Sequence, residues 1–130
     1  MLPKDCWRQL ITICKSWEEV YEKCEVFITC TVASQRYVDR VPKKGGVYLN
    51  VSLRDFHVEF MKGIDLNIVD SWEEVCRENT DIEKANLQSG LKKSDVLEIT
   101  DVLSDDKISG MENRSLMFNP MGMEIGRAHV

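Results

Sequence analysis

ICKSWEEV at residues 13–20 and IVDSWEEV at residues 68–75 are two versions of one pattern. In each segment an apolar run leads into a serine, and a glutamate follows three positions later, the arrangement of a reciprocal capping box at a helix start. Each segment therefore indicates a strand end that runs into a helix. Two such turns, with further apolar runs between them, predict strands and helices that alternate along a parallel sheet.

Five apolar runs are the expected strands of this sheet. They are LITIC at 10–14, VFITCTV at 26–32, VYLNVSL at 47–53, LNIV at 66–69 and LMF at 116–118. The nearly continuous run at 26–32 predicts a central strand that is covered on both faces. Helices are expected at 17–24 and 72–77, and a polar connection around Gly90 at 86–94. Residues 96–103 fit either a short strand or a helix.

Ligands of parallel sheets bind at the carboxyl ends of the strands, so the residues just past each run are the candidates for chemistry. Asn50 and Ser52 are polar residues near the end of an otherwise apolar run, and Arg54 and Asp55 follow it with opposite charges. A carboxylate at this place can face a ligand cleft. From the residues alone, a helix cap or a surface ion pair with Arg54 is the favoured explanation of Asp55.

The bulk composition predicts one ordinary α/β domain without a nucleic-acid or membrane partner. The chain has 130 residues, 43% of them hydrophobic, and a net charge of -5. Its basic pairs are isolated, which argues against the basic stripe that nucleic acids require. The apolar runs are far shorter than the roughly 20 residues of a membrane span, and no signal-peptide pattern opens the chain. We expect a cytoplasmic protein.

The cysteines and histidines do not form a recognisable metal motif. The five cysteines include no C-x-x-C pair, and the two histidines are His57 and His129. Three of the cysteines lie in or beside apolar runs, where a thiol behaves as a small hydrophobe. The sequence therefore predicts reduced, buried thiols and no metal site.

A dinucleotide-binding sheet normally begins with a strand, a G-x-G-x-x-G turn and a helix that holds the pyrophosphate. The chain has no such turn, and its one adjacent glycine pair, Gly45 and Gly46, precedes a strand instead of following one. We therefore expect residues 1–123 to form an incomplete Rossmann-like parallel sheet that lacks its Gly-rich first βαβ unit.

The last seven residues, EIGRAHV at 124–130, match the in-frame translation of a widely used sequencing adapter. The alternative is a genuine helix start after Met123. We expect a non-native tail, in which Arg127 and His129 carry no function.

Four motifs resemble one family. They are VFITCTV at 26–32, GGVYLNVSLRD at 45–55, SWEEVCRENTDIE at 71–83 and LMFNPMGM at 116–123. Together they are similar to the ornithine cyclodeaminase and mu-crystallin family, and within it to the 2,3-diaminopropionate biosynthesis dehydrogenases of siderophore and related pathways. The resemblance covers nearly all of residues 11–123, and NVSLRD and FNPMGM are its specific parts.

The resemblance implies an enzyme that uses NAD and acts at an amino-acid carbon. In the diaminopropionate branch, an adduct of glutamate and a three-carbon diamino acid is oxidised and then hydrolysed to 2-oxoglutarate and 2,3-diaminopropionate. In the cyclodeaminase branch, ornithine is converted to proline and ammonia. A third alternative is a mu-crystallin-like protein that binds nucleotide and a small ligand without turnover.

The resemblance also implies roles for particular residues. Asp55 falls on the catalytic acid/base position. The positions implied to contact the cofactor are Thr31, Asn50, Val51, Ser52, Leu53, Asn119 and Met121. Pro120 and Met121 favour the diaminopropionate branch, because the cyclodeaminase branch has serine and valine there. His57 stands where relatives often carry lysine and is given no role.

The family's first-strand glycines, its ribose-binding acid, and the substrate-binding lysine and arginine of its first lobe have no counterpart in this sequence. We therefore expect the chain to be an inactive segment of a longer dehydrogenase. The implied partner of the intact protein is a small amino-acid substrate. Family members pair through the first lobe, so the parent is expected to be a homodimer.

Overall fold

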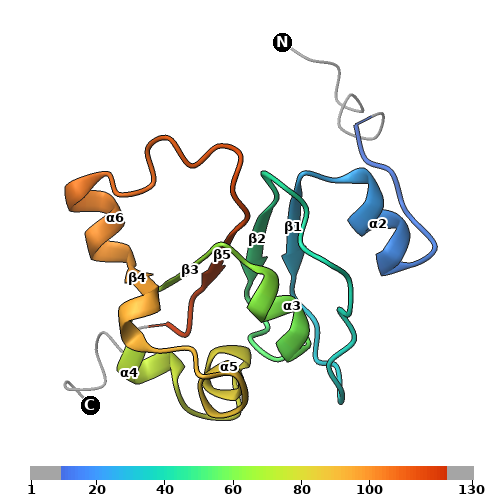
Figure 1. Cartoon of the computed structure of the whole chain (residues 1–130). Coiled ribbons are helices and arrows are strands. Elements are labelled where there is room, and N and C mark those ends of the chain that lie inside the picture. Colours follow the sequence, from blue (N-terminus) through green and yellow to red (C-terminus); the bar gives the residue numbers. More distant parts are fainter. Residues whose placement is uncertain (1–9, 123–130) are drawn as a thin grey trace, which may run out of the picture.

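The computed structural model describes residues 10–122, and within them five parallel strands form one sheet (Figure 1). The strands are β1 (Val26–Thr29), β2 (Val47–Asn50), β3 (Leu66–Val69), β4 (Val96–Glu98) and β5 (Leu116–Asn119), in the order β1-β2-β5-β3-β4. Every neighbouring pair is parallel. The predicted α/β class with a parallel sheet is confirmed.

One helix precedes β1, and the others lie between β2 and β3, β3 and β4, and β4 and β5. The helices are α2 (Trp17–Lys23), α3 (Val58–Gly63), α4 (Trp72–Val75), α5 (Asp81–Ser89) and α6 (Ile99–Asp105), with a 3₁₀ turn at Lys93–Asp95. The last strand of the chain, β5, lies between β2 and β3. The register aligns Thr29 with Asn50 and Leu49 with Phe118, so the polar strand ends Thr29, Asn50 and Asn119 lie at one edge of the sheet.

An aromatic cluster packs on one face of the sheet. Phe27 and Tyr48 are neighbours in the β1–β2 register, and both are buried there with Tyr21 of α2, Phe56 and Phe60 of α3. The rings of Phe56 and Phe60 lie 4.8 Å apart between centroids, and those of Tyr48 and Phe60 lie 5.1 Å apart in an edge-to-face arrangement. Buried aromatic pairs of this kind contribute about 0.5–1.5 kcal/mol beyond the area they bury. This cluster anchors α2 and α3 to the strands.

The run at 26–32 does not form the central, doubly covered strand that its composition predicted. β1 ends at Thr29 and is an edge strand among the described residues. Phe27 and Thr29 are buried, whereas Val26 and Ile28 are 51% and 53% exposed. An apolar run predicts burial on both faces only where elements cover both faces, and here one face of β1 is open.

Three other predicted elements differ from the structure. Residues 10–14 are irregular, and their apolar side chains lie open, with Ile13 at 92% exposure, because no neighbouring strand pairs with them. The strand at 47–53 ends at Asn50, since the chain bends and Leu53 takes a positive φ of 65°. Residues 96–103 contain both alternatives, strand β4 followed by helix α6.

The segment predicted as a polar connection at 86–94 is largely helical. Helix α5 runs to Ser89, and Gly90 ends it with a left-handed φ of 76°, a conformation that glycine adopts without steric cost. The predicted adapter-derived tail at 124–130 lies outside the described residues.

The two predicted capping boxes differ in outcome. Ser16 accepts a hydrogen bond from the Glu19 amide at 3.4 Å, but the Glu19 carboxylate accepts from the Lys15 amide instead of closing the reciprocal box. Ser71 makes no capping bond. The Trp72 amide donates to the Glu98 carboxylate at 3.1 Å, so a residue from β4 takes the place of the predicted local cap.

Thr80 is the strongest cap in the described chain segment. It is fully buried, its hydroxyl accepts from the Glu83 amide at 3.2 Å, and it donates to the Val75 carbonyl. The cap therefore joins the start of α5 to the end of α4.

Replacement of these two caps should have unequal effects. We expect Thr80→Ala to lower the free energy of unfolding by about 1–2 kcal/mol, because it leaves a helix amide and a buried carbonyl without partners. Ser71→Ala should change it by less than about 0.5 kcal/mol, as for an ordinary surface substitution. Urea unfolding of both variants measures the difference, and equal losses would contradict the assignment.

Candidate functional site

Buried polar side chains meet at the carboxyl ends of β1, β2 and β5. Thr29, Asn50 and Asn119 are each less than 3% exposed. The Asn50 side-chain amide donates to the Asn119 oxygen at 3.0 Å, and the Thr29 hydroxyl lies 3.4 Å from the Asn50 oxygen. Because buried polar groups need partners, these residues fix one another across three strands.

Asn50 also shapes the loop that follows β2. Its side-chain oxygen accepts from the Leu53 amide at 2.9 Å, and Leu53 is buried with φ at 65°. This left-handed conformation is unfavourable for a bulky side chain, by about 1–2 kcal/mol. Such strain persists only where surrounding contacts enforce it, and it is common at functional sites.

Asp55 lies at the end of this loop and is only 1% exposed. One of its carboxylate oxygens, Oδ1, accepts from the Thr31 hydroxyl at 2.8 Å. The other, Oδ2, is buried and has no hydrogen-bond partner among the described residues. A buried carboxylate oxygen without a donor is costly, so its presence indicates a place where an additional donor binds.

The backbone around Asp55 is held on both sides. The Asp55 carbonyl accepts from the amides of Tyr37 and Val38 at 3.0 and 2.9 Å. The amides of Asp55 and Phe56 donate to Oδ2 of Asp81 at 3.2 and 3.1 Å. The carboxylate of Asp55 therefore extends from a fixed main chain, although it belongs to a loop.

Asp81, the first residue of α5, is the charged centre beneath the loop. Its Oδ2 also accepts from the Asn50 amide group at 2.9 Å, and its Oδ1 accepts from Nε of Arg36 at 2.6 Å. The carboxylate is fully buried, and the Arg36 side chain is 12% exposed. Burial raises the pKa of Asp81 above its ordinary value, and the hydrogen bonds from Arg36, Asn50 and the Phe56 amide oppose that rise.

Tyr37 is the nearest aromatic hydroxyl to the Asp55–Thr31 pair. Burial, together with the negative charge of Asp55, raises the pKa of the Tyr37 hydroxyl above its ordinary value. It therefore stays protonated at neutral pH and keeps its capacity to donate.

The structure brings together most of the residues that the sequence analysis named. Asp55 and Thr31 are hydrogen-bonded, and the Thr31 amide donates to the Ser52 hydroxyl at 2.5 Å. Asn50, Leu53 and Asn119 form the adjoining network. Two residues stand apart from it: the Val51 side chain is 49% exposed, and Met121 packs partly buried against the hydrophobic core.

Two residues of the network, Arg36 and Asp81, were given no role from the sequence. A local signal for Asp81 exists, because Thr80 and Glu83 have the T-x-x-E spacing of a capping box and place a helix start at this point. Arg36 lies in an irregular segment and meets Asp81 across 45 positions of sequence. No local pattern predicts that pairing.

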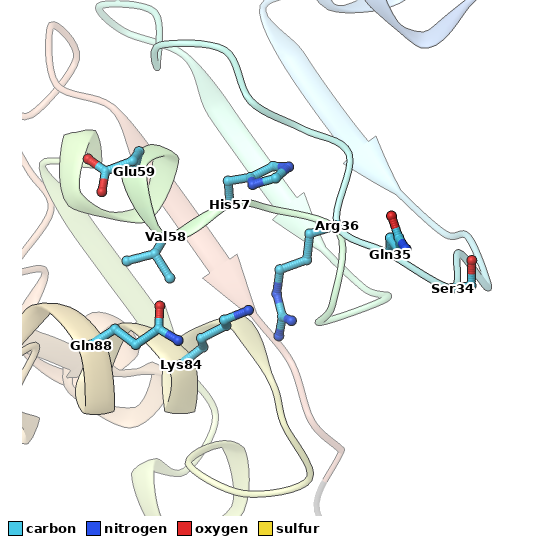
Figure 2. A pocket seen from close by; sticks show the side chains of 8 residues that line it. All are labelled: Ser34, Gln35, Arg36, His57, Val58, Glu59, Lys84 and Gln88. Atoms are coloured by element: carbon cyan, nitrogen blue, oxygen red, sulfur yellow. The ribbon is translucent and has the colours of Figure 1, made fainter.

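A pocket of about 420 Å³ lies beside this network but is not lined by Asp55. Figure 2 shows its lining, with Arg36, Lys84 and His57 facing one space from three different elements. Arg36 forms an ion pair with Asp81, and His57 is exposed at the start of α3. The pocket is thus an open hollow next to the Asp55 site.

The four cysteines within residues 10–122 are free thiols but are not buried as predicted, and Cys6 lies outside the described residues. Cys30 is exposed, and Cys14, Cys24 and Cys76 are half-buried. Within residues 10–122, no three of the histidine, cysteine and acidic side chains gather as a metal site would require. No helix in this part of the chain is long and apolar enough to cross a membrane.

Comparison with known proteins gives one informative relative. No family model matches the chain. Over 112 residues it is 33% identical to N-((2S)-2-amino-2-carboxyethyl)-L-glutamate dehydrogenase from Staphylococcus aureus. The aligned region covers 83% of this chain and 33% of that protein. The chain thus spans about a third of the length of this relative. The similarity and the parallel α/β sheet together support a relationship to a dehydrogenase family.

The two buried carboxylates should respond in opposite ways to the same substitution. Asp55→Asn should raise the free energy of unfolding by roughly 0.5–2 kcal/mol, because a neutral amide is less costly to bury than a carboxylate oxygen without a donor. Asp81→Asn should lower the free energy of unfolding by roughly 1–3 kcal/mol. Both Asp81 oxygens accept hydrogen bonds, so the amide nitrogen of an asparagine would face a donor instead of an acceptor. Denaturant unfolding at neutral pH tests both, and a loss of stability in Asp55→Asn would contradict the site geometry.

Proposed function

We propose that the protein carrying this chain is an NAD-dependent dehydrogenase acting on an adduct of glutamate and a three-carbon diamino acid. In this reaction the amine carbon of the glutamate part loses a hydride to NAD and the nitrogen loses a proton, which gives an imine. Water then adds to the imine and releases 2-oxoglutarate and 2,3-diaminopropionate. The Staphylococcus aureus relative is named for its substrate, an N-(2-amino-2-carboxyethyl) glutamate, which favours this reaction over ornithine cyclisation.

The unpartnered Oδ2 of Asp55 is the observation that carries the proposal. It provides a buried acceptor at the carboxyl edge of a parallel sheet, where ligands of such sheets bind. Imine formation and hydrolysis both require a group that accepts a proton from an amine or from water. We assign this task to Asp55, with the Thr31 hydroxyl holding Oδ1 so that Oδ2 faces the reacting atoms.

The residues at this edge fit the reactive end of a nicotinamide cofactor, which supplies the hydride acceptor when it is bound. Thr31 and Ser52 present polar groups beside the Asp55 carboxylate. A pyrophosphate normally binds at a Gly-rich turn before a helix, and the 130 residues contain no G-x-G-x-x-G sequence. We therefore place the pyrophosphate contacts outside this chain.

Activity should depend on Asp55. In the full-length protein that the gene encodes, we expect Asp55→Asn to lower the rate of NAD-dependent oxidation of the adduct by about a hundredfold to ten-thousandfold. This is the range for loss of a general base. The appearance of reduced nicotinamide measures the rate. Asp39→Asn, a matched change at an exposed carboxylate, should leave the rate unchanged.

Two results of that assay would overturn the proposal. Full activity in Asp55→Asn would remove the acid/base role and favour a protein that binds ligands without turnover. Release of ammonia from ornithine, with no oxidation of the adduct, would identify a cyclodeaminase instead.

The 130 residues alone should bind NAD weakly. We expect no saturable binding in the micromolar range by calorimetry, because the pyrophosphate contacts are lacking. Amide spectra of the same sample establish that the sheet is folded. A micromolar dissociation constant would show that the residues described here hold the cofactor without a Gly-rich turn.

A further inference from the structure

Asp81 lies next to the site and forms a hydrogen bond with the main chain of Asp55. A single oxygen, Oδ2, accepts from the Asp55 amide, the Phe56 amide and the Asn50 side chain at 3.2, 3.1 and 2.9 Å. The Asp81 amide donates to the Leu53 carbonyl at 2.7 Å. One residue of α5 thus binds the end of β2 and the loop after it at four points.

We propose that Asp81 is a positioning residue, which fixes the direction of the Asp55 carboxylate by holding the two amides at Asp55 and Phe56. The inference rests on the proposed function only for the acid/base role of Asp55. That Asp81 holds the two amides follows from the hydrogen-bond geometry. Hydrogen bonds to a charged acceptor are stronger than those to a neutral one, so an aspartate holds these amides more firmly than a local turn would.

Both peptide groups that flank Asp55 are fixed. Asp81 accepts from the amide of each of them, and the amides of Tyr37 and Val38 also donate to the Asp55 carbonyl at 3.0 and 2.9 Å. With both peptide planes fixed, the Cα–Cβ bond of Asp55 has one direction. The Thr31 hydroxyl then selects the rotamer by binding Oδ1 at 2.8 Å. This leaves Oδ2 aimed at one place.

Arg36 has a separate task in this arrangement. Its Nε binds Oδ1 of Asp81 at 2.6 Å, and its Nη2 donates to the Asn79 carbonyl at 2.6 Å. It therefore compensates the buried charge without touching the loop after β2. Oδ1 of Asp81 binds Arg36, whereas Oδ2 binds the loop. Substitutions can therefore separate compensation of the buried charge from the holding of the loop.

Amide hydrogen exchange followed by NMR on the 130-residue chain tests the proposal. In Asp81→Ala we expect the amides of Asp55 and Phe56 to exchange at least about tenfold faster relative to the core amide of Met117, because their acceptor is lost. Asp81→Asn keeps a weaker, neutral acceptor, so a smaller acceleration of the same two amides is expected. This second variant decides the question if Asp81→Ala does not fold.

Arg36→Met is the matched control. It also breaks the buried ion pair and lowers overall stability, but Oδ2 of Asp81 remains in place for the loop. The exchange of Asp55 and Phe56 relative to Met117 should therefore stay within about threefold of the unmodified chain, the usual context-dependence of single contacts. An unchanged ratio in both Asp81 variants, or an equal change in Arg36→Met, would overturn the positioning role.

A kinetic measurement separates this inference from the proposed function. In the protein at full gene length, Asp81→Asn should lower kcat by a larger factor than it changes KM for the cofactor, since its carboxylate holds two amides at Asp55 and Phe56 but only one side chain, Asn50, among the implied cofactor positions. A changed KM with an unchanged kcat would count against positioning. If Asp55→Asn keeps full activity, the proposed function fails, while the exchange experiment still decides whether Asp81 holds the loop.

Discussion

The structure depends on one constraint: five strands run in the same direction, so their carboxyl ends meet at a single edge. Four of these ends carry side chains with hydrogen-bonding groups, and three of the four, Thr29, Asn50 and Asn119, are buried. Burial of these groups without partners would cost several kcal/mol. They bind one another instead, and the strand ends are thereby locked in register beneath the loop that carries Asp55.

The charge at the centre of this edge is balanced locally. Asp81 and Arg36 form a buried ion pair, and such pairs contribute little net stability because desolvation offsets their attraction. What Asp81 adds is geometry, because its second oxygen accepts from three groups of the neighbouring strand and loop. The position of α5 and the shape of the loop after β2 are in this way coupled through one carboxylate.

The sequence predicted the parallel sheet and named several residues that lie together at its carboxyl edge, and it missed what depends on long-range contacts. The runs at 66–69 and 116–118 became β3 and β5, because each is apolar and is bounded by turn residues. Asp55 lies at the strand edge, as expected for the residue that follows a buried run. The run at 10–14 has equal strand propensity but no strand to pair with, so it is irregular. Arg36 and Asp81 meet only in the folded chain.

Two features that oppose stability lie two residues apart in one loop. Leu53 is a buried, bulky residue at a positive φ, and Oδ2 of Asp55 is a buried acceptor without a donor. The other non-glycine residues with positive φ, Glu78, Asn79 and Asp106, are exposed in turns, where such a conformation has a local explanation. The amides of Leu53, Asp55 and Phe56 all donate to side-chain oxygens, which shows that the main chain of this loop is well determined. A well-determined loop that stores strain and leaves one oxygen free is the arrangement expected where a ligand supplies the missing donor.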